Sequence, residues 1–191
     1  MSTWVTDLRH GPPPSAEGGL AAQERGEFVL AVVQAATSRD KSEPWLSAVP
    51  CIAQRGRRRC KSAVQVHQSA PAVEWSCPAC GESGVVTHFE SSAADLSRYW
   101  PRGKTVPWGF DHQERAVLWT ATTHIPELRA IVARAETHGE IEGLLWLRAT
   151  VAELNEIYTL VEELTDGTRS RRRIELLDGL RATLCTSIDG F

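Results

Sequence analysis

The sequence predicts an α+β protein built from a small zinc-ribbon β domain and a C-terminal α+β unit that ends in a helical hairpin. Four cysteines fall between residues 51 and 80, in two groups separated by a stretch long enough for a hairpin. Short runs that alternate apolar and polar residues surround these cysteines, as in strands. The last third of the chain instead shows apolar residues at helical spacing, interrupted by strand-like runs.

Composition limits the classes of function. The chain has 191 residues, of which 42% are hydrophobic and 24% charged, enough for one medium domain or two small ones. The net charge of -3 means that a nucleic-acid partner would have to bind a local basic patch. No apolar run reaches about 18 residues, and the start of the chain lacks the pattern of a secretory signal. We therefore expect a cytoplasmic protein without a membrane partner, in which clustered cysteines bind metal rather than form disulfides.

The first 48 residues are expected to form a tail, a helix and a loop. Residues 1–20 are rich in proline and glycine and are predicted to be a mobile tail. Residues 21–48 hold an N-terminal helix, over 21–37, and a loop whose Trp45 and Leu46 pack on the core. The helix prediction depends on apolar residues spaced for one wide face, and a buried strand over 28–33 is the alternative: Phe28, Val29, Val32, Val33 and Ala36.

Residues 49–92 are predicted to be the zinc ribbon. Three short β-prone runs, 61–66, 73–75 and 85–89, lie around the cysteines. Residues 93–115 form a connector with several prolines and glycines. Its aromatic residues indicate that it packs on one of the domains.

Residues 116–191 are predicted to form an α+β domain of two strands and three helices. Strands are expected over 116–122 and 141–147. The first helix begins near Thr123 and Pro126, and the second begins at a capping box formed by Thr150 and Glu153. The last helix covers residues 170–186 and completes the terminal helical hairpin.

The cysteines Cys51, Cys60, Cys77 and Cys80 are the predicted ligands of one structural zinc ion. Cys77 and Cys80 form a CxxC turn, which Pro78 stiffens and Gly81 follows. Cys51 and Cys60 are separated by eight residues, which would bulge away from the metal. Four thiolates close the coordination shell, so we predict no catalysis at the metal. Replacement of one cysteine by His67, or four buried cysteines without metal, are the alternatives.

A basic cluster lies on and beside the first cysteine loop, and it predicts contact with nucleic-acid phosphates. Between Cys51 and Cys80 the only acid is Glu74. Trp75 could stack on a base if it were exposed, although the core of the ribbon is the preferred place for it. The residues of the cluster are Arg55, Arg57, Arg58, Arg59 and Lys61. A second cluster near the start of the last helix is expected to pair with Glu162, Glu163 and Asp166, and an anionic partner is the alternative: Arg169, Arg171, Arg172 and Arg173.

We assign no catalytic residues from the sequence, because no phosphate-binding loop, nucleophile elbow or zincin motif is present. The leading hypothesis is therefore a non-catalytic zinc-ribbon protein that binds nucleic acid. A protein-interaction adaptor, with a protein partner or a homodimer and a purely structural zinc, is the second. An enzyme that uses Asp111 and His112 beside Trp108 is the third.

Two stretches also carry a resemblance to a known group of proteins. The segment from Pro50 through Cys60, together with Glu74 to Val86, resembles uncharacterised bacterial proteins that join such a ribbon to a C-terminal α+β segment. The segments Asp95–Ser97 and Leu128–Glu136 are similar in order and spacing. Phe89 and Ser91 depart from the tryptophan and glycine expected after the ribbon. The resemblance implies the four-cysteine site and the domain order, and no activity.

Overall fold

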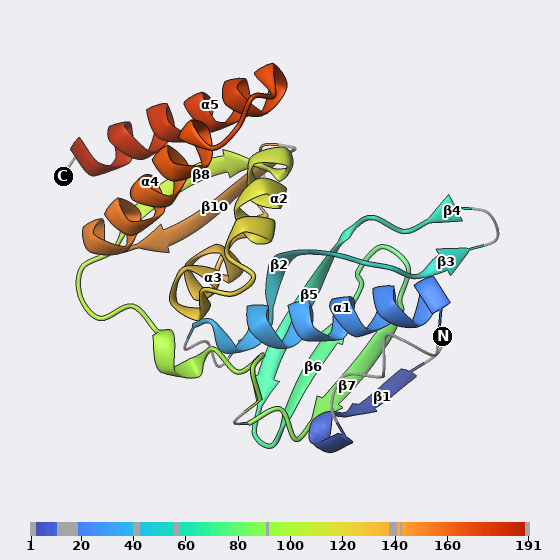
Figure 1. Cartoon of the computed structure of the whole chain (residues 1–191). Coiled ribbons are helices and arrows are strands. Elements are labelled where there is room, and N and C mark those ends of the chain that lie inside the picture. Colours follow the sequence, from blue (N-terminus) through green and yellow to red (C-terminus); the bar gives the residue numbers. More distant parts are fainter. Residues whose placement is uncertain are drawn as a thin grey trace. The chain divides into compact units, whose positions relative to one another are not determined.

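The computed structural model describes residues 3–10, 19–39, 43–55, 58–90, 92–137, 141 and 143–189. The chain divides into two compact units, Met1–Trp100 and Pro101–Phe191. Each unit combines helices with a sheet, which confirms the α+β class (Figure 1).

The first unit is built on a five-stranded sheet in the order β1-β7-β6-β5-β2. All neighbouring strands are antiparallel except β1 and β7, which are parallel. Strands β3 and β4 form a separate two-stranded ladder. In chain order the elements are β1 (Thr3–Asp7), η1 (Leu8–His10), α1 (Gly19–Thr37), β2 (Trp45–Pro50), β3 (Gln54–Arg55), β4 (Arg58–Arg59), β5 (Ala63–Ser69), β6 (Ala72–Ser76), β7 (Ser83–Thr87) and η2 (Ser97–Tyr99).

Helix α1 packs against β2, β5 and β6, and Figure 1 shows it crossing one face of this sheet. The strands alternate, so that Val64, Val66 and Val73 point into the core and are fully buried. Val32 and Val33 of α1 meet them there, in a core cluster that also includes Cys51, Cys77 and Cys80. The cysteines therefore lie at the margin of a core that the N-terminal helix shares with the sheet.

Two segments of this unit differ from their predictions. Thr3–Asp7, expected in the tail, forms β1, because Trp4 packs edge-on against Trp75 at 5.6 Å between ring centroids and donates a hydrogen bond to Glu82. The proline-rich stretch that suggested a tail begins only at Gly11, and 11–18 lie outside the described residues. Trp45–Pro50, expected in a loop, forms β2, in which Trp45 is buried as predicted while Leu46 is 38% exposed.

The second unit has a three-stranded antiparallel sheet in the order β9-β10-β8. Its elements are β8 (Val106–Asp111), α2 (His112–Ala121), α3 (Pro126–Ala133), β9 (Glu136–Thr137), β10 (Leu144–Ala149), α4 (Val151–Asp166) and α5 (Arg171–Asp189). Helices α4 and α5 pack against each other, and α5 also contacts β8 (Figure 1). Trp108 and Phe110 of β8 are buried in this unit, although they were expected in the connector.

Residues 116–122 were predicted to be a strand, and this prediction was wrong. Helix α2 extends over them from His112 to Ala121. It begins at a capping box, in which the Asp111 carboxylate accepts from the Glu114 N–H and the Glu114 carboxylate accepts from the Asp111 N–H. The predicted capping box of Thr150 and Glu153 at the start of α4 is confirmed.

Candidate metal centre

The first cysteine loop is the base of a small hairpin. Cys51 directly follows β2, and its N–H donates to the carbonyl of Ser62 at 2.8 Å. The Cys60 N–H donates to the carbonyl of Ala53, also at 2.8 Å. Strands β3 and β4 pair beyond this point. Residues 52–55 and 58–59 therefore lie on the two sides of a hairpin, which explains how so wide a spacing can bring two cysteines together.

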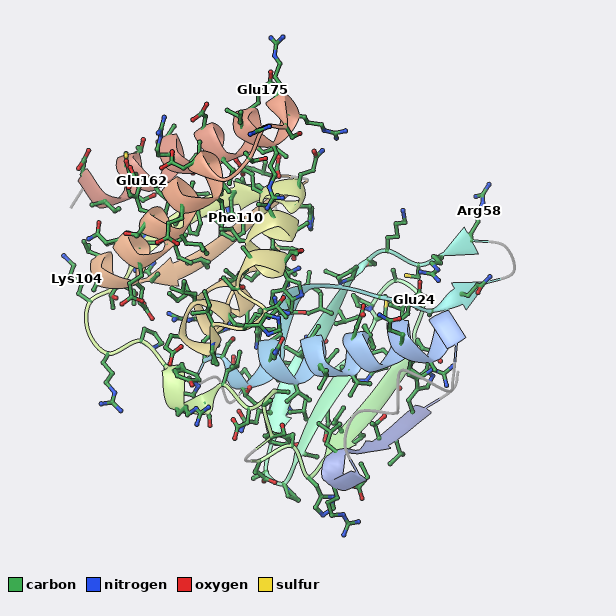
Figure 2. All side chains as sticks on the ribbon, in the orientation of Figure 1. Glu24, Arg58, Lys104, Phe110, Glu162 and Glu175 are labelled. Carbon is green, nitrogen blue, oxygen red and sulfur yellow. The ribbon has the colours of Figure 1, made fainter. Side chains whose placement is uncertain are left out.

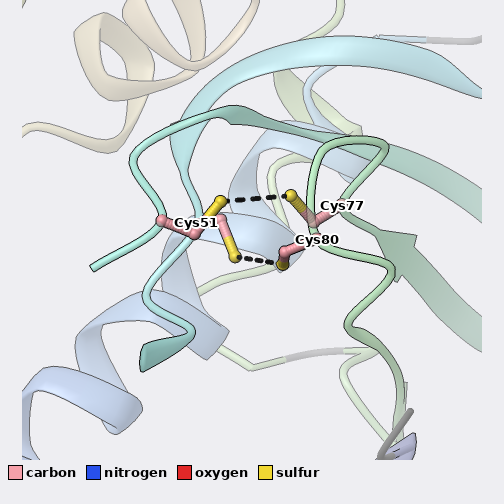
Figure 3. Close-up of side chains that lie close together, drawn as sticks. Cys51, Cys77 and Cys80 are labelled. Atoms are coloured by element: carbon pink, nitrogen blue, oxygen red, sulfur yellow. Dashed lines mark hydrogen bonds between the residues drawn. The ribbon is translucent and has the colours of Figure 1, made fainter. Parts of the chain in front are cut away.

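The second loop is a tight turn between β6 and β7. The Gly81 N–H donates to the Cys77 carbonyl, and the Cys77 N–H donates to the Glu82 carbonyl, each at 2.8 Å. Gly81 has a φ of 72°, in the left-handed region that glycine adopts most easily. The CxxC segment thus turns sharply, with both of its sulfur atoms on the side that faces the first loop (Figure 3).

The four sulfur atoms converge. All the Sγ atoms of Cys51, Cys60, Cys77 and Cys80 lie within 4.8 Å of one another. The Cys51–Cys80 and Cys60–Cys77 distances are each 3.7 Å, and each joins one loop to the other (Figure 3). A tetrahedron with metal–sulfur bonds of about 2.3 Å has edges of about 3.8 Å, whereas a disulfide bond measures about 2.05 Å. The cluster consists of free cysteines and could hold a metal ion.

Burial affects the charge that the thiols of this cluster carry. Cys77 is 1% exposed and Cys51 is 3% exposed. Burial raises the pKa of both thiols. For Cys80 burial also acts to raise the pKa, but the Glu82 N–H and the neighbouring thiols lower it overall. A bound cation would stabilise all four thiolates together, since metal coordination deprotonates thiols.

The structure describes only part of the predicted basic cluster. Arg58 and Arg59 are exposed in β4, and Figure 2 shows Arg58 pointing away from the ribbon. Arg59 forms an ion pair of 2.5 Å with Glu24 of α1, and Lys61 is exposed. Arg57 and the side chain of Arg55 lie outside the described residues. The hairpin is therefore basic, with one of its charges neutralised within the unit.

Trp75 and His67, the candidates for base stacking and for metal binding, both lie in strands of the first unit. Trp75 is 4% exposed and packs edge-on against Phe28 at 4.9 Å between ring centroids. Its ring is therefore not available to stack on a base. His67 lies in β5 and is not a member of the metal cluster, which in the described part of the chain consists of the four cysteines.

The second arginine cluster does not form the ion pairs that we expected. Arg171 pairs with Glu175 at 3.2 Å, one turn further along α5. Arg172 donates a hydrogen bond to Gln113 at 3.4 Å. Arg171 therefore contacts a helical neighbour and Arg172 contacts α2, rather than the acids at the end of α4.

Asp111 and Trp108, two residues of the enzyme hypothesis, make contacts that stabilise the fold. Asp111 and Glu114 form the capping box of α2. Trp108 is fully buried, and its Nε1 donates to the Thr183 hydroxyl at 3.1 Å. These contacts give Asp111 and Trp108 structural roles and supply no support for a reaction at His112.

Comparison with known proteins gives no relative from which a function could be transferred. No family model, curated protein or solved structure matches the chain. None of the described helices is both long and apolar enough to cross a membrane.

Proposed function

We propose that Cys51, Cys60, Cys77 and Cys80 bind one structural zinc ion, and that the first unit is a zinc-ribbon module which binds nucleic acid without catalysing a reaction. The observation that carries the proposal is the convergence of four sulfur atoms within 4.8 Å of one another. Zinc suits four thiolates in a tetrahedron, and a closed shell leaves no position for a substrate or water. The site therefore has the donor set of a structural centre.

The metal would hold the β3–β4 hairpin at its base. Cys51 and Cys60 lie at the two ends of the hairpin, so their coordination would restrain its direction relative to the sheet. Arg58 and Lys61 are exposed on or beside it, and guanidinium groups bind phosphate oxygens well. A basic hairpin held at its base is suited to the phosphate backbone, contacts with which position a protein on nucleic acid.

A protein-interaction adaptor is the second candidate. The Arg59–Glu24 ion pair removes one positive charge from the hairpin, and Trp75 is buried. Both observations favour a module whose metal only maintains shape. In that case the terminal helical hairpin of α4 and α5 would provide a surface for a protein partner or a second copy of the chain.

The metal proposal predicts about one zinc per purified chain by elemental analysis. Cys77→Ser removes a buried ligand, so we expect it to release the metal and disorder the first unit. Cys185→Ser is the matched control, because Cys185 lies in α5 outside the cluster. Metal-free protein with an intact first unit would refute the proposal.

The nucleic-acid proposal predicts binding to generic DNA or RNA that weakens steeply as salt increases. The double variant Arg58→Glu and Lys61→Glu should lose this binding, while the zinc content stays unchanged. The double variant Arg169→Glu and Arg173→Glu, at two exposed arginines at the start of α5 and just before it, makes the same total change of charge and serves as the control. Loss of binding only in the control would move the contact to α5. No binding at low salt would favour the adaptor.

A further inference from the structure

A pair of arginines shares one tryptophan in the second unit. The Cζ atom of Arg129 in α3 lies 3.3 Å from the centroid of the Trp119 ring, and that of Arg115 in α2 lies 4.5 Å from it. Arg129 also donates a hydrogen bond to the carbonyl of Trp119. Two guanidinium groups are thus held beside one indole, at the junction of α2 and α3.

Arg115 is buried without the partners that a guanidinium requires. Its exposed fraction is 9%, and its Nε is buried without a hydrogen-bond acceptor. Burial lowers the pKa of Arg115 to about 10, and no carboxylate of the described residues offsets this effect. The face of an indole attracts a cation but offers no lone pairs in the plane of the guanidinium.

The nearby Arg129 adds a second positive charge close to Arg115. Burial, and after it the positive charge of Arg115, lowers the pKa of Arg129 to about 10. Like charges that approach each other out of water repel, and each also loses hydration. A negative group beside Arg115 would supply the counter-charge that Arg115 lacks among the described residues.

Another arginine in the same unit shows how this fold satisfies a buried guanidinium. Arg134 is also buried, and it binds Glu153 at 2.5 Å. It donates further to the carbonyls of Ala130 and Arg148. Arg134 thus has a counter-charge and carbonyl acceptors, whereas Arg115 has neither within the described part of the chain.

We propose that Arg115, with Arg129 at the same tryptophan ring, binds a phosphate-type oxyanion, either free or carried by a larger ligand. Two guanidinium groups can offer several N–H donors to the oxygens of one phosphate. Arg129 is only half-buried, which leaves the pair accessible from solvent on its side. The site belongs to the second unit and does not depend on the metal centre or on the basic hairpin.

The test is calorimetric titration of the full-length protein with inorganic phosphate at constant ionic strength. We expect saturable binding, weakened at least tenfold in Arg115→Gln and unchanged in Arg98→Gln. Arg98 is the control because it also stacks on an aromatic ring, that of Tyr99, at an exposed position. Absence of saturable binding to the wild-type protein, or equal binding by Arg115→Gln, overturns the proposal. The wild-type measurement decides even if Arg115→Gln fails to fold.

Two further arms define the ligand and exclude a merely structural role. Binding of a nucleoside 5′-monophosphate more tightly than phosphate would identify a phosphoryl group on a larger ligand, and equal binding would identify the free anion. Binding of acetate without phosphate would refute the phosphate class. In phosphate-free buffer Arg115→Gln should unfold at the same temperature as the wild type or higher, since it removes an uncompensated charge. Saturating phosphate should reverse that order.

Discussion

At the scale of single residues, the close packing around residue 84 explains why that position holds a glycine. Gly84 in β7 lies directly against the indole of Trp75. A Cβ at this position would lie 2.6 Å from Trp75 Nε1 and 2.9 Å from the carbonyl oxygen of Trp4. The absence of a side chain therefore allows β1 and β7 to pair while Trp75 stays in the core.

Gly84→Ala should destabilise the first unit by about 1–3 kcal/mol, because the core must open to accept the methyl group. Denaturant unfolding followed by tryptophan fluorescence measures this change. Gly109→Ala is the matched control in β8, since a Cβ there meets the Trp146 ring at an ordinary 3.5 Å. Equal stability of the two variants would contradict the close packing at Gly84.

The contacts of Arg115 show why the surroundings of a buried arginine were hard to predict from the sequence. The i, i+4 spacing of Arg115 and Trp119 is visible in the sequence, but it is also common on exposed helix faces. Arg129 meets them only through the packing of α3 on α2. The one available sequence signal was thus a cation and an aromatic ring one turn apart, but we had predicted that Arg115 ends the connector and that Trp119 lies in a strand.

At the scale of elements, periodicity predicted the long helices well and the short segments poorly. The apolar faces of α1, α4 and α5 repeat over several turns, and the Thr150–Glu153 capping box marks the start of α4. Segment 116–122 is too short for its pattern to separate a helix from a strand, and Asp111 was not recognised as a cap. Strand β1 depends on a distant partner, β7, which no local pattern reveals.

The Asp111 cap gives the element-scale prediction. Asp111→Ala removes the acceptor of the Gln113 and Glu114 N–H groups, and it should destabilise the second unit by about 1 kcal/mol. Asp111→Asn retains a capping oxygen and should cost much less. Thermal unfolding followed by circular dichroism compares the two. A similar loss in both variants would show that the charge, rather than the cap, is what α2 requires.

At the scale of the whole molecule, the sequence predicted the cysteines of the candidate site more completely than it predicted the fold around them. Spacing alone indicated the four cysteines, because a CxxC turn and a second pair across a hairpin suit tetrahedral coordination. The sequence did not reveal that α1 packs on the same sheet, since burial of α1 depends on contacts between residues far apart in the chain. The cysteine cluster is therefore part of a larger folded unit than a minimal ribbon.

This organisation predicts a divided response to metal removal. A chelator should reduce hydrogen-exchange protection in β5, β6 and β7, because Cys51, Cys77 and Cys80 belong to the core cluster that these strands share with α1. Protection in β8, β10, α4 and α5 should persist, because Leu145, Leu154 and Leu177 are buried within a separate compact unit. Addition of zinc should restore the first pattern. Uniform loss of protection across both units would mean that they fold as one cooperative body, and no loss at all would mean that α1 and the sheet are stable without the metal.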